Sequence, residues 1–309
     1  MKPLRIGSRG SALALWQANF VRGELEQAGV ACEIVIIKTT GDAAPDAPVA
    51  GIGVKGVFIK ELEDALLDGR VDLAVHSMKD VPTAIPEGLA FPAICRRHDP
   101  SDALISRSGG GLRDLAKGAR VGTSSVRRQA QLRAARPDLE FADLRGNVDT
   151  RLRKLDSGAY DAIVLARAGL VRLGLSQRIS EVISTDICLP AVGQGAVGVE
   201  TRAADDVTRA AVGRLDHAES RIAVEAERAL LAHLEGGCQV PLGALASLDG
   251  NRLTLEGCVA SPDGRTVVRD RMDGDVGEPA RLGRALGEGL LSKGAGKILE
   301  LAGRAASHG

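Results

Sequence analysis

Residues 58–76 read FIKELEDALLDGRVDLAVH and combine a helical pattern with a strand pattern. The first twelve residues of this stretch place apolar side chains at helical spacing, and the apolar run Leu73–His76 after the turn is typical of a buried strand. Two more strands are predicted earlier, at Leu4–Ile6 and Cys32–Lys38, with a helix over Ala12–Ala28 between them. Strands that alternate with helices in this way predict a mostly parallel sheet covered by helices.

The same alternation returns in the middle of the chain. Strands and helices are predicted there in the order Arg120–Gly122, Val126–Ala135, Phe141–Leu144, Val148–Ser157 and Ala162–Leu165. From about Asp216 the pattern changes to a helix ending at Leu234, then the strands Leu242–Ser247, Arg252–Ala260 and Thr266–Arg271, then one Gly- and Ala-rich final helix. We therefore predict an α/β protein with two α/β lobes and a small C-terminal α+β domain.

The composition is that of a folded, water-exposed protein. A chain of 309 residues with 44% hydrophobic and 26% charged residues suggests two or three domains rather than a disordered segment. No apolar run reaches the length of a membrane span, and the start MKPLRIGSRGSALALWQ lacks the features of a signal peptide. These features predict a cytoplasmic protein that does not interact with a membrane.

The formal net charge is zero, so no overall field attracts nucleic acid. One Trp, one Tyr and four Phe are also too few for the stacking platforms that single-stranded nucleic acids require. Most of the forty basic residues are arginines, and they occur in clusters. Because the guanidinium group suits bidentate capture of carboxylates, a small polyanionic ligand is the better prediction, although any single arginine could simply serve solubility.

Polar residues follow directly after several predicted strands, at the edge where open α/β sheets bind ligands. They are Arg9, Ser11, Lys79, Asp80, Thr123, Ser124, Ser125 and Arg145. In GTSSVRRQ the hydroxyl groups also stand at a helix start, where free backbone N–H groups favour an anion. An ordinary N-cap is the alternative for Ser125. The repetition at several strand ends favours a shared anion site.

Asp80, in HSMKDVPT, is the one carboxylate among these cations. An acid in a carboxylate-binding site repels the ligand, so Asp80 either caps the turn before Pro82 or handles protons and positive charge in a reaction. The five histidines show no metal-binding spacing, and no metal is predicted.

The five cysteines form no CxxC pair, which argues against a disulfide framework and a zinc ribbon. Cys238 alone lies in a glycine-rich loop, LEGGCQVPL, residues 234–242. This setting is typical of a working thiol, with an inert loop thiol as the alternative. A nucleophilic pair of Cys238 with His233 is a third interpretation.

The ordered motifs identify a resemblance to the porphobilinogen deaminase family along nearly the whole chain. They read RIGSRGSALALWQA (5–18), VKGVFIKELE (54–63), DLAVHSMKDVPT (72–83), VGTSSVRRQAQL (121–132), LRGNVDTRLRKL (144–155), LPAVGQGAVGVE (189–200) and LEGGCQVPLGA (234–244). The resemblance implies two lobes like those of periplasmic binding proteins and a C-terminal domain. The expected divisions are residues 1–95 with 196–213, residues 101–189 and residues 218–309.

The resemblance also implies a function. Members of the family join four porphobilinogen molecules head to tail, with loss of ammonia, and release hydroxymethylbilane. They carry a dipyrromethane cofactor on the cysteine of the GGC loop through a thioether, which here is Cys238. Flexible glycines before this cysteine would help a tethered, growing chain to fit its site. Family members are expected to be monomers.

Residue roles follow position by position from the resemblance. Asp80 matches the catalytic carboxylate, which assists proton transfer and stabilises cationic azafulvene or pyrrolium species. Cofactor-binding positions are Ser11, Ser77, Lys79, Thr123, Ser125, Arg127, Arg128, Arg145 and Gln194, and substrate-binding positions are Arg9, Lys55, Phe58, Arg151 and Arg172. The chain departs from the family at Val54, where glycine is usual, and at Arg167, where a small apolar residue is common.

Two functions from other classes are weighed against this one. A non-catalytic anion-binding protein would need neither Cys238 nor Asp80, and a thiol hydrolase would need neither the arginines nor a bound pigment.

Overall fold

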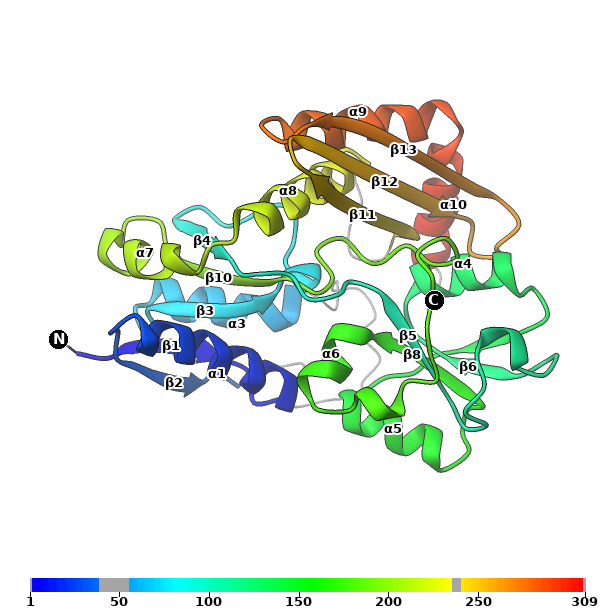
Figure 1. The fold of residues 1–309 in the computed structure, drawn as a ribbon, viewed down its shortest axis with the longest axis horizontal. Coiled ribbons are helices and arrows are strands. Elements are labelled where there is room, and N and C mark those ends of the chain that lie inside the picture. Colours follow the sequence, from blue (N-terminus) through cyan, green and yellow to red (C-terminus); the bar gives the residue numbers. More distant parts are fainter. Residues whose placement is uncertain (1, 39–55, 235–239, 308–309) are drawn as a thin grey trace. The chain divides into compact units, whose positions relative to one another are not determined.

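The structure is a computed structural model that describes residues 2–38, 56–234 and 240–307 (Figure 1). It contains two compact units, one from Met1–His98 with Ala196–Arg221 and one from Asp99–Gly195 with Ile222–Gly309. In the described ranges, no helix combines the length and apolar character needed to cross a membrane. Each unit is described separately below.

The first unit contains a five-stranded sheet. Its strands are, in spatial order, β2 (Cys32–Ile36), β1 (Leu4–Ser8), β3 (Leu73–Ser77), β10 (Val197–Arg202) and β4 (Leu89–Ile94). β1 runs parallel to both β2 and β3, whereas β10 is antiparallel to β3 and β4. The strand β10 comes from a segment more than a hundred residues further along the chain and completes this sheet.

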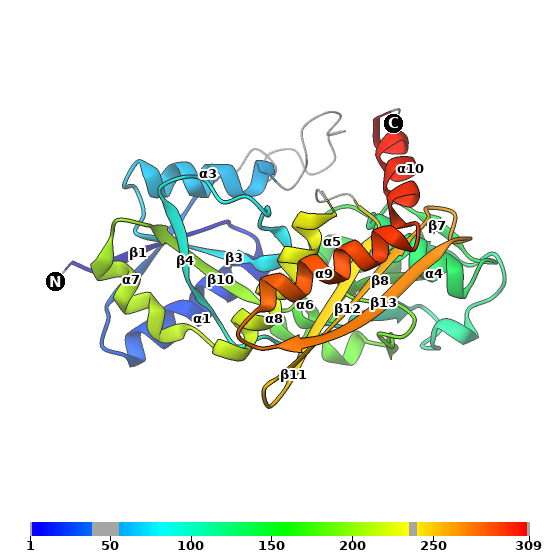
Figure 2. The same ribbon diagram turned by 90° about the horizontal axis from the view of Figure 1, so that it is seen from above.

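Helices cover both faces of this sheet, as Figure 2 shows for α1 (Ala12–Gln27) and α3 (Gly56–Leu67). Leu73 lies in a core with α1, whereas its neighbour Ala74 lies in a core with α3. Successive side chains of a strand point to opposite faces, so β3 is buried on both sides. The first unit is completed by the short helix α7 (Asp206–Val212).

The second unit contains a sheet of the same design. Its strands are β7 (Glu140–Ala142), β6 (Arg120–Gly122), β8 (Ala162–Ala166), β5 (Asp102–Ser106) and β9 (Glu181–Val182). As in the first sheet, the second strand in this order, here β6, is parallel to its two neighbours, and the fourth strand, β5, is antiparallel to both of its own. The helices α4 (Val126–Ala135) and α5 (Val148–Asp156) pack in separate cores on this sheet, and α6 (Arg167–Arg172) follows β8.

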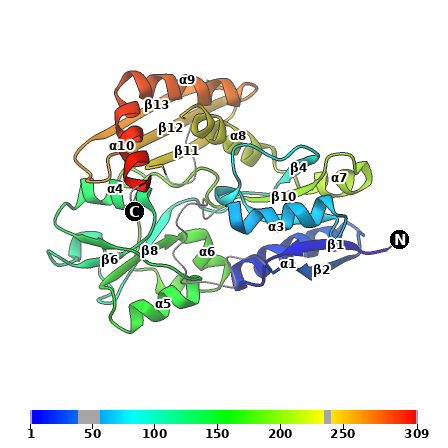
Figure 3. The ribbon, with the colours of Figure 1, turned by 180° about the vertical axis from the view of Figure 1, so that it is seen from behind.

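The C-terminal part of the second unit is an antiparallel three-stranded sheet with helices on one face (Figure 3). The strands are β11 (Leu242–Asp249), β12 (Arg252–Ala260) and β13 (Val267–Asp275). The helices are α8 (Ala218–His233), which belongs to this unit from Ile222 onward, α9 (Pro279–Ser292) and α10 (Ala295–Ser307). Leu230 of α8 and Leu286 and Leu290 of α9 are fully buried in the same core as Leu253 and Leu255 of β12. The predicted fold class, two α/β lobes with a small α+β part, is confirmed.

Several element boundaries differ from the predictions. The predicted strand Phe141–Leu144 lies at Glu140–Ala142, because Leu144 already belongs to the connection that leads to α5. The single predicted final helix is two helices, α9 and α10, separated at Gly294. The φ angle of Gly294 is 99°, a left-handed conformation that interrupts a right-handed helix and that glycine adopts without strain.

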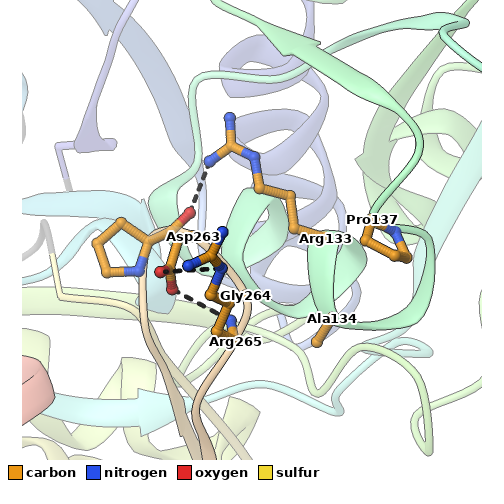
Figure 4. A pocket seen from close by; sticks show the side chains of 7 residues that line it. Arg133, Ala134, Pro137, Asp263, Gly264 and Arg265 are labelled. Atoms are coloured by element: carbon orange, nitrogen blue, oxygen red, sulfur yellow. Dashed lines mark hydrogen bonds and ion pairs between the residues drawn. The ribbon is translucent and has the colours of Figure 1, made fainter.

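The hairpin turn between β12 and β13 docks on the end of α4 (Figure 4). Arg133 Nη1 donates a hydrogen bond of 2.6 Å to the Pro262 carbonyl, and its guanidinium lies 5.2 Å from the centre of the Phe141 ring. A Cβ atom on Gly264 would lie 2.7 Å from the Ala134 nitrogen. Only glycine therefore allows this close approach. The adjoining cavity, about 720 Å³, is lined by none of the predicted site residues.

Replacing Gly264 by alanine is expected to destabilise the second unit more than replacing Gly250. Both glycines lie in hairpin turns at positive φ, 73° and 57°, so both substitutions add backbone strain of about 1–2 kcal/mol. Only the Gly264 methyl group meets another backbone, while Gly250 has nothing within 4 Å, so Gly264→Ala should cost roughly 1–3 kcal/mol more. Urea unfolding of the two variants measures the difference. Equal losses would show that the turn does not depend on this contact.

Candidate functional site

In the first unit, the predicted residues gather at the carboxyl ends of two neighbouring parallel strands. Arg9 and Ser11 follow β1, and Ser77 ends β3. Lys79 and Asp80 belong to η1 (Met78–Asp80), a single 3₁₀ turn that follows at once. Because β1 and β3 pair in parallel, these five residues lie at one edge of the sheet, where α/β proteins bind ligands.

Hydrogen bonds fix the serines at this edge. Ser11 is the N-cap of α1, and its hydroxyl accepts a hydrogen bond of 3.3 Å from the Ala14 N–H. The Ser77 hydroxyl accepts one of 2.7 Å from Nε2 of Gln17, a buried side chain of α1. The start of α1 and the end of β3 are thereby held together, with their polar groups at a defined place.

Backbone hydrogen bonds define the turn that carries Asp80. The Met78 N–H donates to the Ala196 carbonyl at 3.0 Å, and the Val81 N–H donates to the Met78 carbonyl at 3.2 Å. Asp80 itself is half-buried. Since main-chain groups close the turn, we expect its backbone geometry to survive the loss of the Asp80 charge.

A buried pair, which the sequence interpretation missed, lies directly before this turn. Nε2 of His76 is 2.9 Å from Oε2 of Glu200, and both side chains are almost completely buried. Glu200 pairs in register with Ala74, so the contact crosses diagonally from β10 to β3. Burial, and then the nearby charge of Glu200, raise the pKa of Glu63 on α3, which is therefore close to the same pair. The only sequence signal is a polar residue within each apolar strand.

In the second unit, Thr123 and Ser125 follow β6, and Arg145 follows β7, its parallel neighbour. Ser125 is the N-cap of α4, but its hydroxyl is 3.5 Å from the Arg128 nitrogen, the upper limit of a hydrogen bond. The Thr123 hydroxyl accepts a hydrogen bond of 3.3 Å from the Ser125 N–H. The capping role predicted as the alternative for Ser125 is therefore present, with weak geometry.

Two of the predicted arginines of this unit, Arg151 and Arg172, donate hydrogen bonds to main-chain carbonyls. Arg151, on α5, donates from Nε to the Gly146 carbonyl at 2.7 Å. Arg172, at the end of α6, is buried, and its Nη2 donates to the Gly195 carbonyl at 2.7 Å. Arg145 is exposed. Arg167, one of the two expected departures from the family, forms an ion pair with Asp99.

Arg127 and Arg128 lie inside the second unit, where they meet a carboxylate that the sequence interpretation missed. Asp102, the first residue of β5, has an exposed fraction of 0%. Its Oδ2 is 2.8 Å from Nη1 of Arg127, and its Oδ1 is 2.7 Å from Nη2 of Arg128. A carboxylate at the start of an apolar run, here DALIS, was the signal that could have revealed it.

Two more residues complete this group, which we call the Asp102 cluster: Asp102, Arg127, Arg128, Cys188 and Gln194. Gln194, a predicted cofactor-binding residue, donates from Nε2 to Asp102 Oδ1 at 2.9 Å. The Cys188 sulfur lies 3.6 Å from Asp102 Oδ2 and 3.3 Å from Arg127 Nη1. All five side chains are at least nine-tenths buried.

The ionisation states in the Asp102 cluster follow from burial and charge. Burial alone would raise the pKa of Asp102, but the charges of Arg127 and then Arg128 outweigh it and hold the pKa well below its usual range. Burial raises the pKa of Cys188 to about 12, so its thiol stays protonated. Two guanidinium groups therefore face one carboxylate, and among the described residues one positive charge of the cluster has no counter-charge. The Nε atom of Arg127 is buried without a hydrogen-bond partner in the part of the chain that the structure describes.

Cys238 and Lys55 lie outside the described residues, and the Phe58 side chain is not described. The elements on either side of Cys238 are described, however, and Glu227 of α8 connects them. Its carboxylate is fully buried and accepts hydrogen bonds from the Gly193 N–H at 2.7 Å and from the Ala246 N–H of β11 at 2.9 Å. The helix before the GGC loop, the strand after it and the loop containing Gln194 are thus joined by one side chain.

Comparison with solved structures finds similar folds at low identity. A periplasmic substrate-binding protein of an ABC transporter from Coxiella burnetii is 15% identical, with a TM-score of 0.41, over 69% of this chain and 91% of that chain. A lipoprotein of the YaeC family from Enterococcus faecalis is 14% identical, with a TM-score of 0.41, over 69% of this chain and 91% of that chain.

Comparison with protein families gives two matches. Residues 4–210 match the family described as "Porphobilinogen deaminase, dipyromethane cofactor binding domain". Residues 221–292 match "Porphobilinogen deaminase, C-terminal domain". The two matches follow each other in the expected order and span nearly all of the sequence. The chain therefore belongs to the porphobilinogen deaminase family.

Proposed function

We propose that Cys238 carries the dipyrromethane cofactor, that Asp80 is the catalytic carboxylate and that the polar residues described above bind the carboxylates of cofactor and substrate. As a family member the chain is a transferase of tetrapyrrole biosynthesis, which condenses four porphobilinogen molecules with loss of ammonia to give hydroxymethylbilane. When it is bound, the dipyrromethane cofactor supplies the pyrrole to which the first substrate is joined.

The single observation that carries the proposal is the unbalanced positive charge of the Asp102 cluster. A buried charge without a counter-charge is costly, and the buried Nε atom of Arg127 adds a donor without a partner among the described residues. An anionic ligand group that accepts a charge-assisted hydrogen bond offsets both costs. The pyrroles of cofactor and substrate each bear carboxylates, so the residues present fit such a group.

The proposal divides the residues by role. The cofactor-binding set is Ser11, Ser77, Lys79, Thr123, Ser125, Arg127, Arg128, Arg145 and Gln194. The substrate-binding set is Arg9, Lys55, Phe58, Arg151 and Arg172. Asp80 holds or moves a proton at its carboxylate and offsets the positive charge that develops on a pyrrole, which the arginines alone would oppose.

Mass spectrometry of the intact protein under denaturing conditions tests the proposal. The purified chain should carry a covalent adduct of two pyrroles, and incubation with porphobilinogen should add a ladder of single-pyrrole steps. An anion-binding protein without catalytic activity would show neither, and a thiol hydrolase would show an acyl adduct or none. An unmodified chain that turns over porphobilinogen at full rate would contradict the proposal.

Truncation of Arg145 and of Arg127 should have different effects on stability. The exposed Arg145 can lose its side chain with little change in the free energy of unfolding, whereas Arg127→Ala weakens the compensation of the buried Asp102, which is expected to cost roughly 3–5 kcal/mol. Both variants should weaken carboxylate binding by on the order of 1.5–3 kcal/mol and stall at different points of the ladder. Urea unfolding and mass spectra of the stalled complexes measure the two effects. Wild-type ladders in both variants would count against a carboxylate-binding role.

We also propose, from the family resemblance, that the protein is a cytoplasmic monomer. Sedimentation velocity with and without porphobilinogen tests the oligomeric state, and a stable dimer at micromolar concentration would reject that part of the proposal.

A further inference from the structure

Asp102 forms hydrogen bonds with three predicted ligand-binding residues, whereas one ion pair would be enough to neutralise its charge. It bonds Arg127 through Oδ2, and it bonds Arg128 through Oδ1 at two nitrogens, Nε at 3.0 Å and Nη2 at 2.7 Å. Gln194 donates to the same Oδ1. Three of the residues proposed to bind the cofactor therefore share one buried carboxylate, although they come from α4 and from a loop more than sixty residues later.

Main-chain carbonyls complete the arrangement of the two guanidinium groups. Nη1 of Arg127 also donates to the Leu189 carbonyl at 2.6 Å, and Nη1 of Arg128 donates to the Val164 carbonyl at 3.1 Å. Each guanidinium is thus bonded on more than one side, and neither side chain is free to change rotamer without breaking hydrogen bonds to Asp102. A guanidinium fixed in this way loses little conformational entropy when it binds a ligand carboxylate.

The charge of Asp102 also limits how strongly the cluster attracts an anion. With Asp102 ionised, the cluster has one net positive charge, and without that charge it would have two. In an environment of low effective dielectric constant, each charge attracts an anion more strongly than it would in water. The weaker attraction makes it easier for a polycarboxylate product to dissociate from the enzyme.

We infer that Asp102 is a positioning residue for carboxylate recognition: it fixes Arg127, Arg128 and Gln194 in one geometry and cancels one of the two arginine charges. This inference rests on the proposed function, because it takes the bound carboxylates to be those of the pyrrole chain. Asp102 does not itself contact the ligand in this role, and it acts only through the residues that it holds.

The test compares Asp102→Asn with a matched control, Asp72→Asn. Asp72 likewise lies between two arginines, Arg5 at 2.8 Å and Arg202 at 3.3 Å, but it precedes β3 at the end of the sheet opposite Asp80. Both variants remove one negative charge from an arginine pair. The melting temperature should fall in both, and for the fully buried Asp102 by roughly 10 °C.

The ladder of enzyme-bound pyrroles distinguishes positioning from a purely structural role. Measured well below its melting temperature, Asp102→Asn should accumulate intermediates that the wild type does not. Its kcat should be about 10- to 100-fold lower, because the carboxylates of the bound pyrrole chain are held in the wrong position. Asp72→Asn should keep the wild-type ladder and a kcat within about two-fold, since it moves no proposed ligand-binding residue. A folded Asp102→Asn with the wild-type ladder and kcat would overturn the inference.

If Asp102→Asn does not fold, Asp102→Glu provides the second test, because it keeps the charge and displaces the carboxylate by one methylene group. If Asp102 is a positioning residue, the ladder of enzyme-bound pyrroles should be altered in this variant as well. A wild-type ladder would again overturn the inference. Failure of the proposed function is recognised separately, because then the wild type itself carries no pyrrole adduct.

Discussion

Asp80→Asn is expected to fold like the wild type and to lose turnover by about 10²- to 10⁴-fold. The amide keeps the shape of the side chain and an oxygen that could cap the turn, but it removes the negative charge. The turn is closed by the main-chain bonds of Met78 and Val81, so folding does not require that charge. We expect turnover to require that charge, because each condensation places positive charge on a pyrrole that must then lose a proton.

Steady-state turnover, thermal melting and the mass of the bound cofactor together separate the two roles of Asp80. The variant should melt near the wild-type temperature and retain the cofactor, and Asp80→Glu should keep a small residue of activity.

Asp114→Asn is the matched control for a capping role. Asp114 is also the third residue of a 3₁₀ turn, Leu112–Asp114, and its carboxylate accepts a hydrogen bond of 2.8 Å from the Gly111 N–H. The amide keeps an acceptor oxygen for this cap, so Asp114→Asn should lower stability by roughly 0.5 kcal/mol or less and leave turnover unchanged. If Asp80→Asn behaved like this control, Asp80 would be a cap and its catalytic role would be rejected.

Cys238→Ser is expected to give a folded protein with no covalent pyrrole adduct and no measurable synthesis of hydroxymethylbilane. The hydroxyl group is nearly isosteric with the thiol, but a serine is a far weaker nucleophile than a thiolate, so the thioether cannot be replaced at a useful rate. Intact mass spectra should therefore show the variant lighter than the wild type by the two pyrroles, apart from the exchange of sulfur for oxygen.

Cys32→Ser provides the control for the attachment experiment. Cys32 is half-buried in β2, and burial, its largest influence, raises the pKa of its thiol, so it has little thiolate character. This variant should keep the adduct and the activity. An adduct that persists in Cys238→Ser and disappears in Cys32→Ser would place the attachment elsewhere.

The sequence predicted the elements that carry the strand-end residues because their apolar spacing is local information. β1, β3 and α4 lie within one or two residues of the predicted ranges at most boundaries. The strand β10 could not be predicted as part of the first sheet from periodicity, since its pairing with β3 depends on contacts between residues more than a hundred positions apart.

The same reason explains what the sequence missed in the site. The stretch GTSSVRRQ at the start of α4 indicated an anion site, but Asp102, the partner of its two arginines, is 25 and 26 residues away from them and is brought to them only by the order β8-β5 of the sheet. Glu227 appears in the sequence as one more acidic residue on a helix of mixed polarity. Its role depends on backbone N–H groups of Gly193 and Ala246, and because nearly every residue has such a group, the sequence does not show which ones a buried carboxylate will bind.

The common strand order of the two five-stranded sheets means that β3 of the first has its counterpart in β8 of the second, and α1 has its counterpart in α4. Ser11 and Ser125 cap these equivalent helices. After the equivalent strands, however, one copy continues with Asp80 in its first turn and the other with Arg167. The same arrangement of strands and helices thus occurs twice. A carboxylate, Asp80, follows the third strand of one sheet, and a guanidinium, Arg167, follows the third strand of the other. On the proposed roles, a scaffold that occurs twice thus carries the proton-transfer group in one copy only, whereas carboxylate-binding residues are proposed in both.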